Sequence, residues 1–308
     1  MIYEDLTLVT SKDGEQIAVW EVVDETTHKQ KSAAITRQNI FLTHGTFSDK
    51  KVCLGIASYL AGLGHACYIM EWRGHGHSSK PKDKFNFETV ATYDYEAAFR
   101  YLFDERKLTN LHCVTHSGGG VGLAMFLVQN SSYITRINSI STFACQAFGA
   151  VLNPISYTKI LAAKAFTKVL GYIPAKKLGL GPFNESYYTM TQWYDWNLQK
   201  NFKSSFIKNK DIDKQLKPVN ERFDYRQGMA NITTPIYAIS GKGDRFISPT
   251  QGCQLFFDKF ANTDNVFIEY AKSSGHLEDY DHTRILMSRN AAAEIWPTVA
   301  SWIEKYSH

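Results

Sequence analysis

Three polar side chains lie next to glycines and have the chemical types needed for nucleophilic attack on a carbonyl carbon: Ser117, Asp244 and His276. A serine hydroxyl is a weak nucleophile at neutral pH, so it needs a neighbouring base that takes its proton. A histidine can be that base, and a carboxylate can orient the imidazole and stabilise its charged form. We therefore predict that these three residues form a catalytic triad.

The segment around Ser117 has the pattern of a strand, a sharp turn and a helix. Residues 111–114 are an apolar run typical of a buried strand, three glycines follow the serine, and residues 121–129 are an apolar helical segment. Such a turn exposes the hydroxyl and requires small neighbours. Gly119 fits the G-x-S-x-G pattern, whereas Thr115 stands where the first glycine is usual. Because a serine before glycines can also belong to a flexible loop, the surrounding elements must decide.

Two of the three assignments have a rival. His282, six residues after His276, is the other candidate base, but it follows a polar run rather than a strand, so we favour His276. Asp244 could serve only its turn, as an aspartate beside a glycine often does. The apolar strand expected directly before Asp244 favours the catalytic role.

The elements that must position these residues alternate between strands and helices. We expect an amino-terminal hairpin at residues 2–10 and 16–23. Further strands are expected at 39–43, 66–72, 111–114, 134–141, 235–240 and 266–270, and helices at 51–64, 87–103, 121–129, 251–260 and 290–305. This alternation predicts an α/β fold with a mostly parallel sheet covered by helices on both faces. Active residues of such sheets gather beyond the carboxyl ends of the strands.

The alternation stops between about residues 146 and 228, a stretch rich in aromatic side chains. It has helical apolar spacing at Ile155, Leu161, Ala165 and Val169. We predict that residues 1–145 and 229–308 form the core and that 146–228 form an inserted helical cap, or lid. A cap above the strand ends would wall the substrate pocket, and its apolar surface would select an apolar substrate.

The composition excludes several functional classes. The chain has 308 residues, 44% of them hydrophobic, which is enough for a full core. A formal charge of +4 from 34 basic and 30 acidic residues leaves no dense basic stripe, so we expect no nucleic-acid partner. The lysine-rich stretch 200–217 has interspersed acids and is typical of a solvated face. Five scattered cysteines predict reduced core thiols. No apolar run is long enough to span a membrane and no signal peptide is visible, which predicts a cytoplasmic protein.

Four stretches together resemble the α/β-hydrolase superfamily, in particular its lipase-like and esterase-like serine hydrolases, over nearly the whole chain. They are His44-Gly45-Thr46, Arg73-Gly74-His75-Gly76-His77-Ser78, the turn from Thr115 to Gly119, and Gly275-His276. The chain order serine, aspartate, histidine agrees. The resemblance implies the α/β-hydrolase fold. A serine at 117 disfavours the branches that would use an aspartate there.

The resemblance also implies an oxyanion hole made by two backbone N–H groups, those of Gly118 and Thr46, with Phe47 as the alternative to Thr46. Phe47 and His116 flank these atoms and are the candidate substrate-binding residues, although the side chain of His116 is expected to turn away from the substrate. The resemblance also places His75 and His77 in a structural loop beside the site. No carboxylate or cysteine joins them at ligand spacing, so we expect no metal site.

We therefore predict a serine hydrolase that cleaves small-molecule carboxylic esters through an acyl-enzyme intermediate, with an apolar acyl part and without a cofactor. Thioester, lactone, amide and carbon-carbon bond hydrolysis, and acyl transfer, remain open alternatives. A lipase whose residues 155–170 act as an interfacial lid is one version. A member that binds a small molecule without turnover is the rival from another class, and only Thr115 favours it. The oligomeric state is left open.

Overall fold

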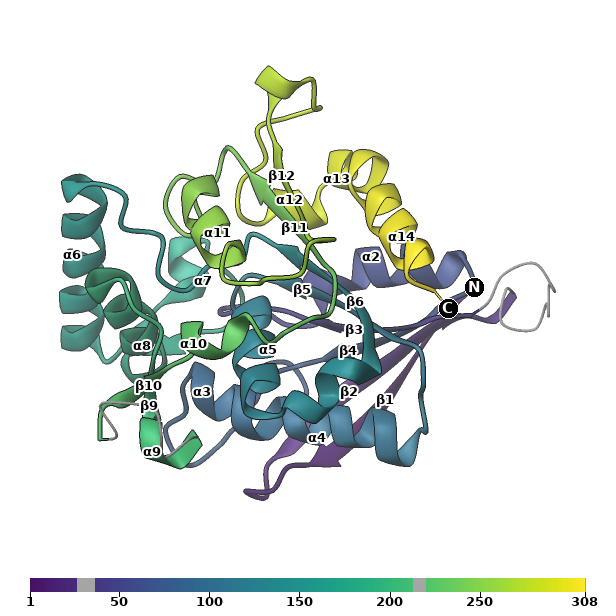
Figure 1. Cartoon of the computed structure of the whole chain (residues 1–308), viewed down its shortest axis with the longest axis horizontal. Helices are drawn as coiled ribbons and strands as arrows, with labels where there is room; N and C mark the ends of the chain where they lie inside the picture. Colours follow the sequence, from purple (N-terminus) through teal and green to yellow (C-terminus); the bar gives the residue numbers. More distant parts are fainter. Residues whose placement is uncertain (27–36, 213–219, 308) are drawn as a thin grey trace.

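The centre of the molecule is an eight-stranded sheet, which the computed structural model shows within residues 1–26, 37–212 and 220–307 (Figure 1). The strand order is β1-β2-β4-β3-β5-β6-β11-β12. The strands are β1 (Ile2–Thr10), β2 (Gln16–Asp24), β3 (Asn39–Thr43), β4 (Ala66–Met70), β5 (Leu111–His116), β6 (Ile137–Phe143), β11 (Ile236–Gly241) and β12 (Val266–Tyr270). β1 and β2 form the predicted hairpin and pair antiparallel, whereas the strands from β4 to β12 run parallel. The chain therefore has the predicted α/β-hydrolase architecture.

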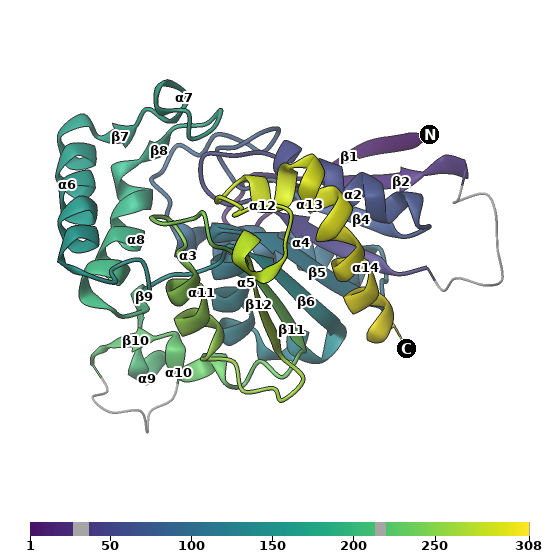
Figure 2. The ribbon, with the colours of Figure 1, turned by 90° about the horizontal axis from the view of Figure 1, so that it is seen from above.

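Helices cover both faces of this sheet, and each face has its own apolar core (Figures 1 and 2). On one face lie α2 (Lys51–Gly62), α12 (Arg284–Met287), α13 (Arg289–Glu294) and α14 (Trp296–Lys305). On the other lie α3 (Phe87–Thr89), α4 (Tyr95–Arg100), α5 (Gly118–Gln129) and α11 (Thr250–Phe257). The helix predicted over residues 87–103 contains π-helical turns at Val90–Asp94 and Tyr101–Glu105.

The strand that carries the candidate nucleophile is buried along its whole length. All six residues of β5 are buried, between β3 and β6. Ten of the twelve residues of α5 are buried as well, because this helix is apolar all round and packs directly behind the strand. The turn between β5 and α5 therefore joins a fully buried strand to an almost fully buried helix.

The described residues of the predicted cap stretch, 146–212 and 220–228, which we call the cap segment, lie beside the sheet at the edge of the molecule (Figures 1 and 2). Its main helices are α6 (Pro154–Leu170) and α8 (Tyr187–Gln199), with short helices α7 (Ala175–Leu178), α9 (Asn209–Ile212) and α10 (Arg226–Met229). Two small antiparallel pairs, β7 (Tyr172–Ile173) with β8 (Glu185–Ser186) and β9 (Lys203–Lys208) with β10 (Arg222–Asp224), were not expected from the sequence. Its separation from the core as a domain stays a prediction.

A buried carboxylate joins the cap segment to the core. Glu88 on α3 accepts hydrogen bonds from Tyr225 Oη at 2.7 Å, from the Ser205 N–H at 2.6 Å and from Ser204 Oγ. Gln192 on α8 adds a hydrogen bond of 3.3 Å from Nε2 to Glu88 Oε2. These satisfied polar contacts attach the cap segment to the core.

All five cysteines are buried and unpaired, which agrees with the prediction of reduced core thiols. Burial raises the pKa of the Cys113 and Cys145 thiols, so they stay protonated at neutral pH. Among the described residues, no helix combines the length and apolar character that crossing a bilayer would require.

Candidate active site

Ser117 stands on a strained turn at the carboxyl end of β5. Its φ of 53° and ψ of −125° lie in a region that residues other than glycine rarely adopt. The turn is held by very close packing, since a Cβ atom at Gly45 would lie 2.8 Å from Ser117 Cβ and one at Gly119 would lie 2.8 Å from the carbonyl oxygen of His44. The strain is therefore maintained by the neighbouring loop, and it presents the hydroxyl at the surface of a cavity.

Thr115 is accommodated without loss of this turn. Its side chain is fully buried, and a Cβ atom at Gly120 would lie 3.0 Å from Thr115 Oγ1 and 2.4 Å from Cys145 Sγ. Gly120, in the first turn of α5, thus leaves the space that the side chain of Thr115 occupies. The departure from the usual pattern does not weaken the geometry at Ser117.

A histidine and an aspartate continue from Ser117 as a chain of hydrogen bonds. His282 Nε2 lies 2.8 Å from Ser117 Oγ, and His282 Nδ1 lies 2.6 Å from Asp244 Oδ2. Asp244, directly beyond β11, also accepts the backbone N–H groups of Ile247 and Ser248, each at 3.0 Å. Burial opposes the charged carboxylate, but the hydrogen bond and charge of His282, with the backbone N–H groups of Ser248 and Phe246, outweigh it and lower the pKa of Asp244.

The prediction that His276 completes this constellation is wrong. His276 Nδ1 contacts Glu294 Oε1 at 3.1 Å, and its ring lies against Tyr270 at 4.3 Å between centroids. The reason is the strand order: β12 is three places from β5, or roughly 14 Å at the usual spacing, so a residue directly after β12 is too far from Ser117. A histidine that reaches Ser117 must therefore come from farther along the loop after β12, which returns across the sheet. His282 lies at the end of that loop.

His116 supports this loop and does not line the cavity, so its prediction as a substrate-binding residue is also wrong. It is buried, and its Nε2 donates a hydrogen bond of 2.8 Å to the carbonyl oxygen of His282. Burial, followed by the nearby His282, lowers the pKa of His116 to about 3, so its ring is neutral. A neutral ring that donates from Nε2 helps to fix the backbone at His282.

The loop after β3 brings Thr46, one of the two predicted oxyanion-hole residues, to the cavity in front of Ser117. Thr46 and Gly118 both line the cavity beside Ser117. Gly118 is the first residue of α5, where a backbone N–H has no partner within the helix. His44 holds the loop from behind: Nδ1 lies 2.7 Å from the carbonyl oxygen of Gly45, and Nε2 accepts the N–H of Trp72 at 3.3 Å. Burial lowers the pKa of His44 to about 3, which keeps this arrangement neutral.

The N–H of Phe47, the alternative to that of Thr46, has another partner. It donates to Glu185 Oε1 of β8 at 3.2 Å. The same oxygen lies 2.9 Å from His75 Nε2, while His75 Nδ1 faces the carbonyl oxygen of Arg73 at 3.0 Å. Both ring nitrogens of His75 thus face acceptors, as in a charged imidazolium. Burial lowers its pKa, but the charge and hydrogen bond of Glu185 outweigh burial, so the pKa of His75 is raised.

We expect Glu185→Gln to loosen the loop that carries Thr46. The lost charged hydrogen bonds should lower the free energy of unfolding by about 2 kcal/mol and lower kcat for ester hydrolysis by roughly tenfold because one oxyanion donor is displaced. Because the pKa of His75 is raised in the folded state, its pair with Glu185 stabilises the folded protein fully at pH values below the ordinary histidine pKa of about 6.5. This stabilisation is lost as the pH rises through the raised pKa of His75. The Tm difference between wild type and variant should therefore be largest below about pH 6.5 and narrow as the pH rises above it.

Glu278→Gln is the matched control. It removes the partly exposed pair with Arg284, 2.8 Å apart, so it should lower the unfolding free energy by less than about 1 kcal/mol and leave kcat unchanged. A Glu185→Gln enzyme that retains wild-type kcat and shows a pH-independent Tm difference would contradict the role of Glu185.

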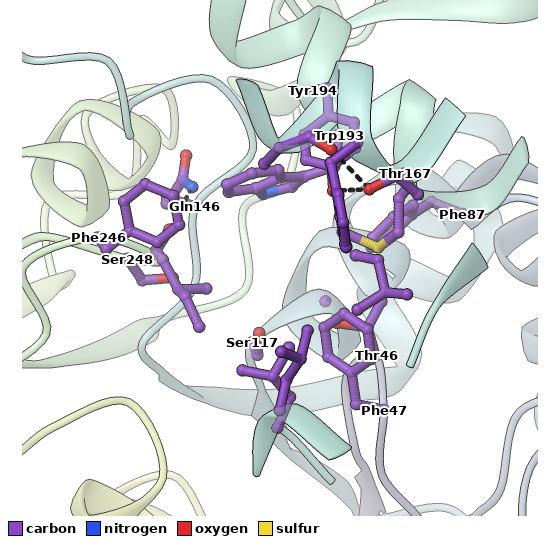
Figure 3. Close-up of a pocket in the computed structure, with 18 residues that line it drawn as sticks. Thr46, Phe47, Phe87, Ser117, Gln146, Thr167, Trp193, Tyr194, Phe246 and Ser248 are labelled. Atoms are coloured by element: carbon purple, nitrogen blue, oxygen red, sulfur yellow. Dashed lines mark hydrogen bonds between the residues drawn. The ribbon is translucent and has the colours of Figure 1, made fainter. Parts of the chain in front are cut away.

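The cavity in front of Ser117 is about 200 Å³ in volume, and none of the described residues that line it is charged. Figure 3 shows Ser117 and Thr46 on one side and Trp193 and Tyr194 of α8 on the opposite side. Phe47, a predicted substrate-binding residue, also lines the cavity. The other lining residues, mostly apolar, are Phe87, Gly118, Gln146, Ala163, Phe166, Thr167, Ile173, Leu178, Leu180, Met190, Phe246, Ile247 and Ser248. Within the described part of the chain, no cluster of side chains has the composition of a metal site.

Comparisons with known proteins agree with this architecture. A family model described as the alpha/beta hydrolase fold matches residues 38–279, ending just before His282. The structure is similar to an esterase from Exiguobacterium antarcticum (TM-score 0.64, 15% identity, 97% of this chain and 99% of that one). It is also similar to mouse alpha/beta hydrolase domain-containing protein 10 (0.62, 14%, 98% and 99%) and to a thermophilic esterase from Thermogutta terrifontis (0.59, 12%, 99% and 100%). No curated protein matches the chain by sequence similarity.

Proposed function

Because the chain belongs to the alpha/beta hydrolase family, we propose that it is a serine hydrolase that cleaves small carboxylic esters with an apolar acyl part. The observation that carries the proposal is the unbroken series of hydrogen bonds from Ser117 through His282 to Asp244 at the edge of an apolar cavity. The esterases among the structural neighbours are consistent with it.

In the proposed mechanism, Ser117 Oγ attacks the ester carbonyl while His282 Nε2 takes the hydroxyl proton. Asp244 holds Nδ1–H and stabilises the imidazolium that forms. The N–H groups of Gly118 and Thr46 stabilise the negative oxygen of the tetrahedral intermediate. His282 then gives the proton to the leaving alcohol, which leaves an acyl group on Ser117. Water attacks this acyl-enzyme by the same steps in reverse order, and no cofactor is needed.

The walls of the cavity support an uncharged, apolar substrate. A charged acyl group would lose its hydration there without finding an ionic partner, which is costly. The few polar side chains on the walls, including Gln146 and Thr167, can orient a neutral group but cannot compensate a charge. We therefore expect a preference for neutral aliphatic or aromatic acyl chains over dicarboxylic ones.

The experiment that tests the proposal combines turnover with active-site labelling. Purified protein is assayed on p-nitrophenyl esters of increasing acyl length, and a fluorophosphonate adduct is located by peptide mass spectrometry. We expect turnover with a preferred chain length and an adduct on Ser117. Labelling of Ser117 without turnover of any ester would redirect the search to thioesters, amides or acyl transfer. If the protein showed no turnover of any ester and no labelling of Ser117, the proposal would be overturned and a binding protein would be favoured.

A further inference from the structure

The outer helix of the cap segment is exposed to an unusual degree for an apolar helix. Only Ile160 and Thr167 are buried among the 17 residues of α6, and its inner side packs on α8. The side chains of Val169, Ile155 and Phe166 are 86%, 66% and 54% exposed. Soluble proteins rarely leave so many neighbouring large apolar side chains in water unless the surface has a partner.

These side chains form one surface, which we call the α6–α7 face. Ile155, Ala162, Phe166 and Val169 follow one another at helical spacing along α6. Exposed apolar residues of α7 and its flanks extend it. The large apolar members of the face are Leu152, Ile155, Tyr157, Leu161, Phe166, Val169, Leu170, Tyr172, Leu178 and Leu180. Figures 1 and 2 show α6 at the outer edge of the molecule, away from the sheet.

The charge of this face has a single sign. Residues 147–184 contain five lysines and no aspartate, glutamate or arginine. Lys164 pairs with Asp195 of α8, while Lys159, Lys168, Lys176 and Lys177 are exposed. An exposed apolar helix that carries lysines and no acidic side chain has the composition that binds the interface of a membrane with anionic lipids. A second copy of the chain is a poorer partner, because a two-fold contact would bring the lysines of both copies together.

The face is continuous with the mouth of the cavity. Phe166, Leu178 and Leu180 line the cavity in front of Ser117 and are also exposed on the α6–α7 face. A molecule leaving a lipid layer covered by this face would enter the cavity without crossing water. Phe246 is also exposed and lines the cavity from the core side.

We propose that the α6–α7 face docks on the surface of a membrane that contains anionic lipids, with the mouth of the cavity turned toward the lipid. The helix α6, about 25 Å long, lies flat in the interface with Ile155, Phe166 and Val169 among the acyl chains and the lysines at the headgroups. Docking itself does not depend on hydrolysis, whereas the delivery of apolar esters from the membrane rests on the proposed function.

The test is sedimentation of the full chain with vesicles of phosphatidylcholine alone or of phosphatidylcholine mixed with phosphatidylglycerol. Wild type should bind the mixed vesicles at least about tenfold more tightly, and added salt should reduce the difference. Ile155→Glu combined with Val169→Glu should weaken binding by about a hundredfold. Neither residue lines the cavity, so turnover of a soluble short-chain ester should stay at the wild-type value.

Two further variants separate the possible reasons for failure. Leu8→Glu combined with Met287→Glu changes the net charge equally at exposed apolar positions outside the face, and it should bind vesicles nearly as wild type does. Ser117→Ala should bind as wild type does, so binding without turnover would leave docking intact and overturn only the proposed hydrolysis. Circular dichroism confirms that each variant is folded.

Three results would overturn the docking proposal. One is wild type that stays in the supernatant with both kinds of vesicle. Another is binding that the Ile155 and Val169 substitutions leave unchanged, or weaken no more than the Leu8 and Met287 pair does. The third is that wild type forms a dimer and binds no vesicles, and that the α6 substitutions dissociate this dimer. That result would assign the face to contact between copies of the chain.

Discussion

His282→Ala is expected to lower kcat for ester hydrolysis by about 10⁵-fold to 10⁶-fold, the loss typical of removing the base of a serine triad. The reason is geometric, since His282 Nε2 is 2.8 Å from Ser117 Oγ and is held on its other side by Asp244. Without this imidazole the hydroxyl proton has no acceptor in place. The measurement is kcat and KM on the best p-nitrophenyl ester, with KM expected to change little.

His276→Ala is the matched control, because it removes the same side chain from the same loop. His276 contacts Glu294 and Tyr270 rather than the nucleophile, so kcat should stay within about threefold of wild type. The variant is expected to lose a little stability instead. If His276→Ala abolished turnover while His282→Ala remained active, the arrangement of the triad drawn from the structure would be wrong.

The two histidines show why part of the site could be predicted from sequence and part could not. Ser117 and Asp244 each come directly after a buried strand, and the rule that active residues follow strand ends locates both. The same rule selects His276, but it takes no account of the strand order. Because β12 is the outermost strand, the base must come from farther along the loop, and the apolar pattern of single strands does not reveal that distance.

His116 and Glu185 could not have been assigned from local sequence, because their partners are far away in the chain. His116 acts on a carbonyl oxygen 166 residues later, and Glu185 reaches back 138 residues to the N–H of Phe47. Nothing within a window around either residue marks it. A single sequence can identify a nucleophile by its turn, but the residues that hold the machinery in place depend on tertiary packing.

The cap segment illustrates a different limit. Its helical spacing at Ile155, Leu161, Ala165 and Val169 correctly predicted a helix, and such spacing usually indicates a buried face. In the structure all four side chains are exposed, and the buried side of α6 carries Ile160 and Thr167. Periodicity therefore identified the helix but not the face that packs on the protein, because it cannot distinguish a core from a surface that another partner would cover.

Ser117→Ala is expected to reduce kcat by about 10⁶-fold and to abolish the fluorophosphonate adduct, because no other hydroxyl takes the position of Oγ. Members of a triad act as one unit, so the double variant Ser117→Ala with His282→Ala should be no slower than either single variant. Asp244→Asn should be milder, at about 10⁴-fold, since it disturbs only the orientation and charge of His282.

The comparison of single and double variants distinguishes a triad from two independent contributions. Independent groups would multiply their effects, and the double variant would then fall far below the more damaged single one. Ser117→Ala, His282→Ala and their double variant should share one residual rate. This rate measures what the Thr46 and Gly118 N–H groups and the apolar cavity contribute without an activated nucleophile. If the Ser117→Ala enzyme kept wild-type turnover, the nucleophile would have to be sought elsewhere, and the strained turn at Ser117 would need another explanation.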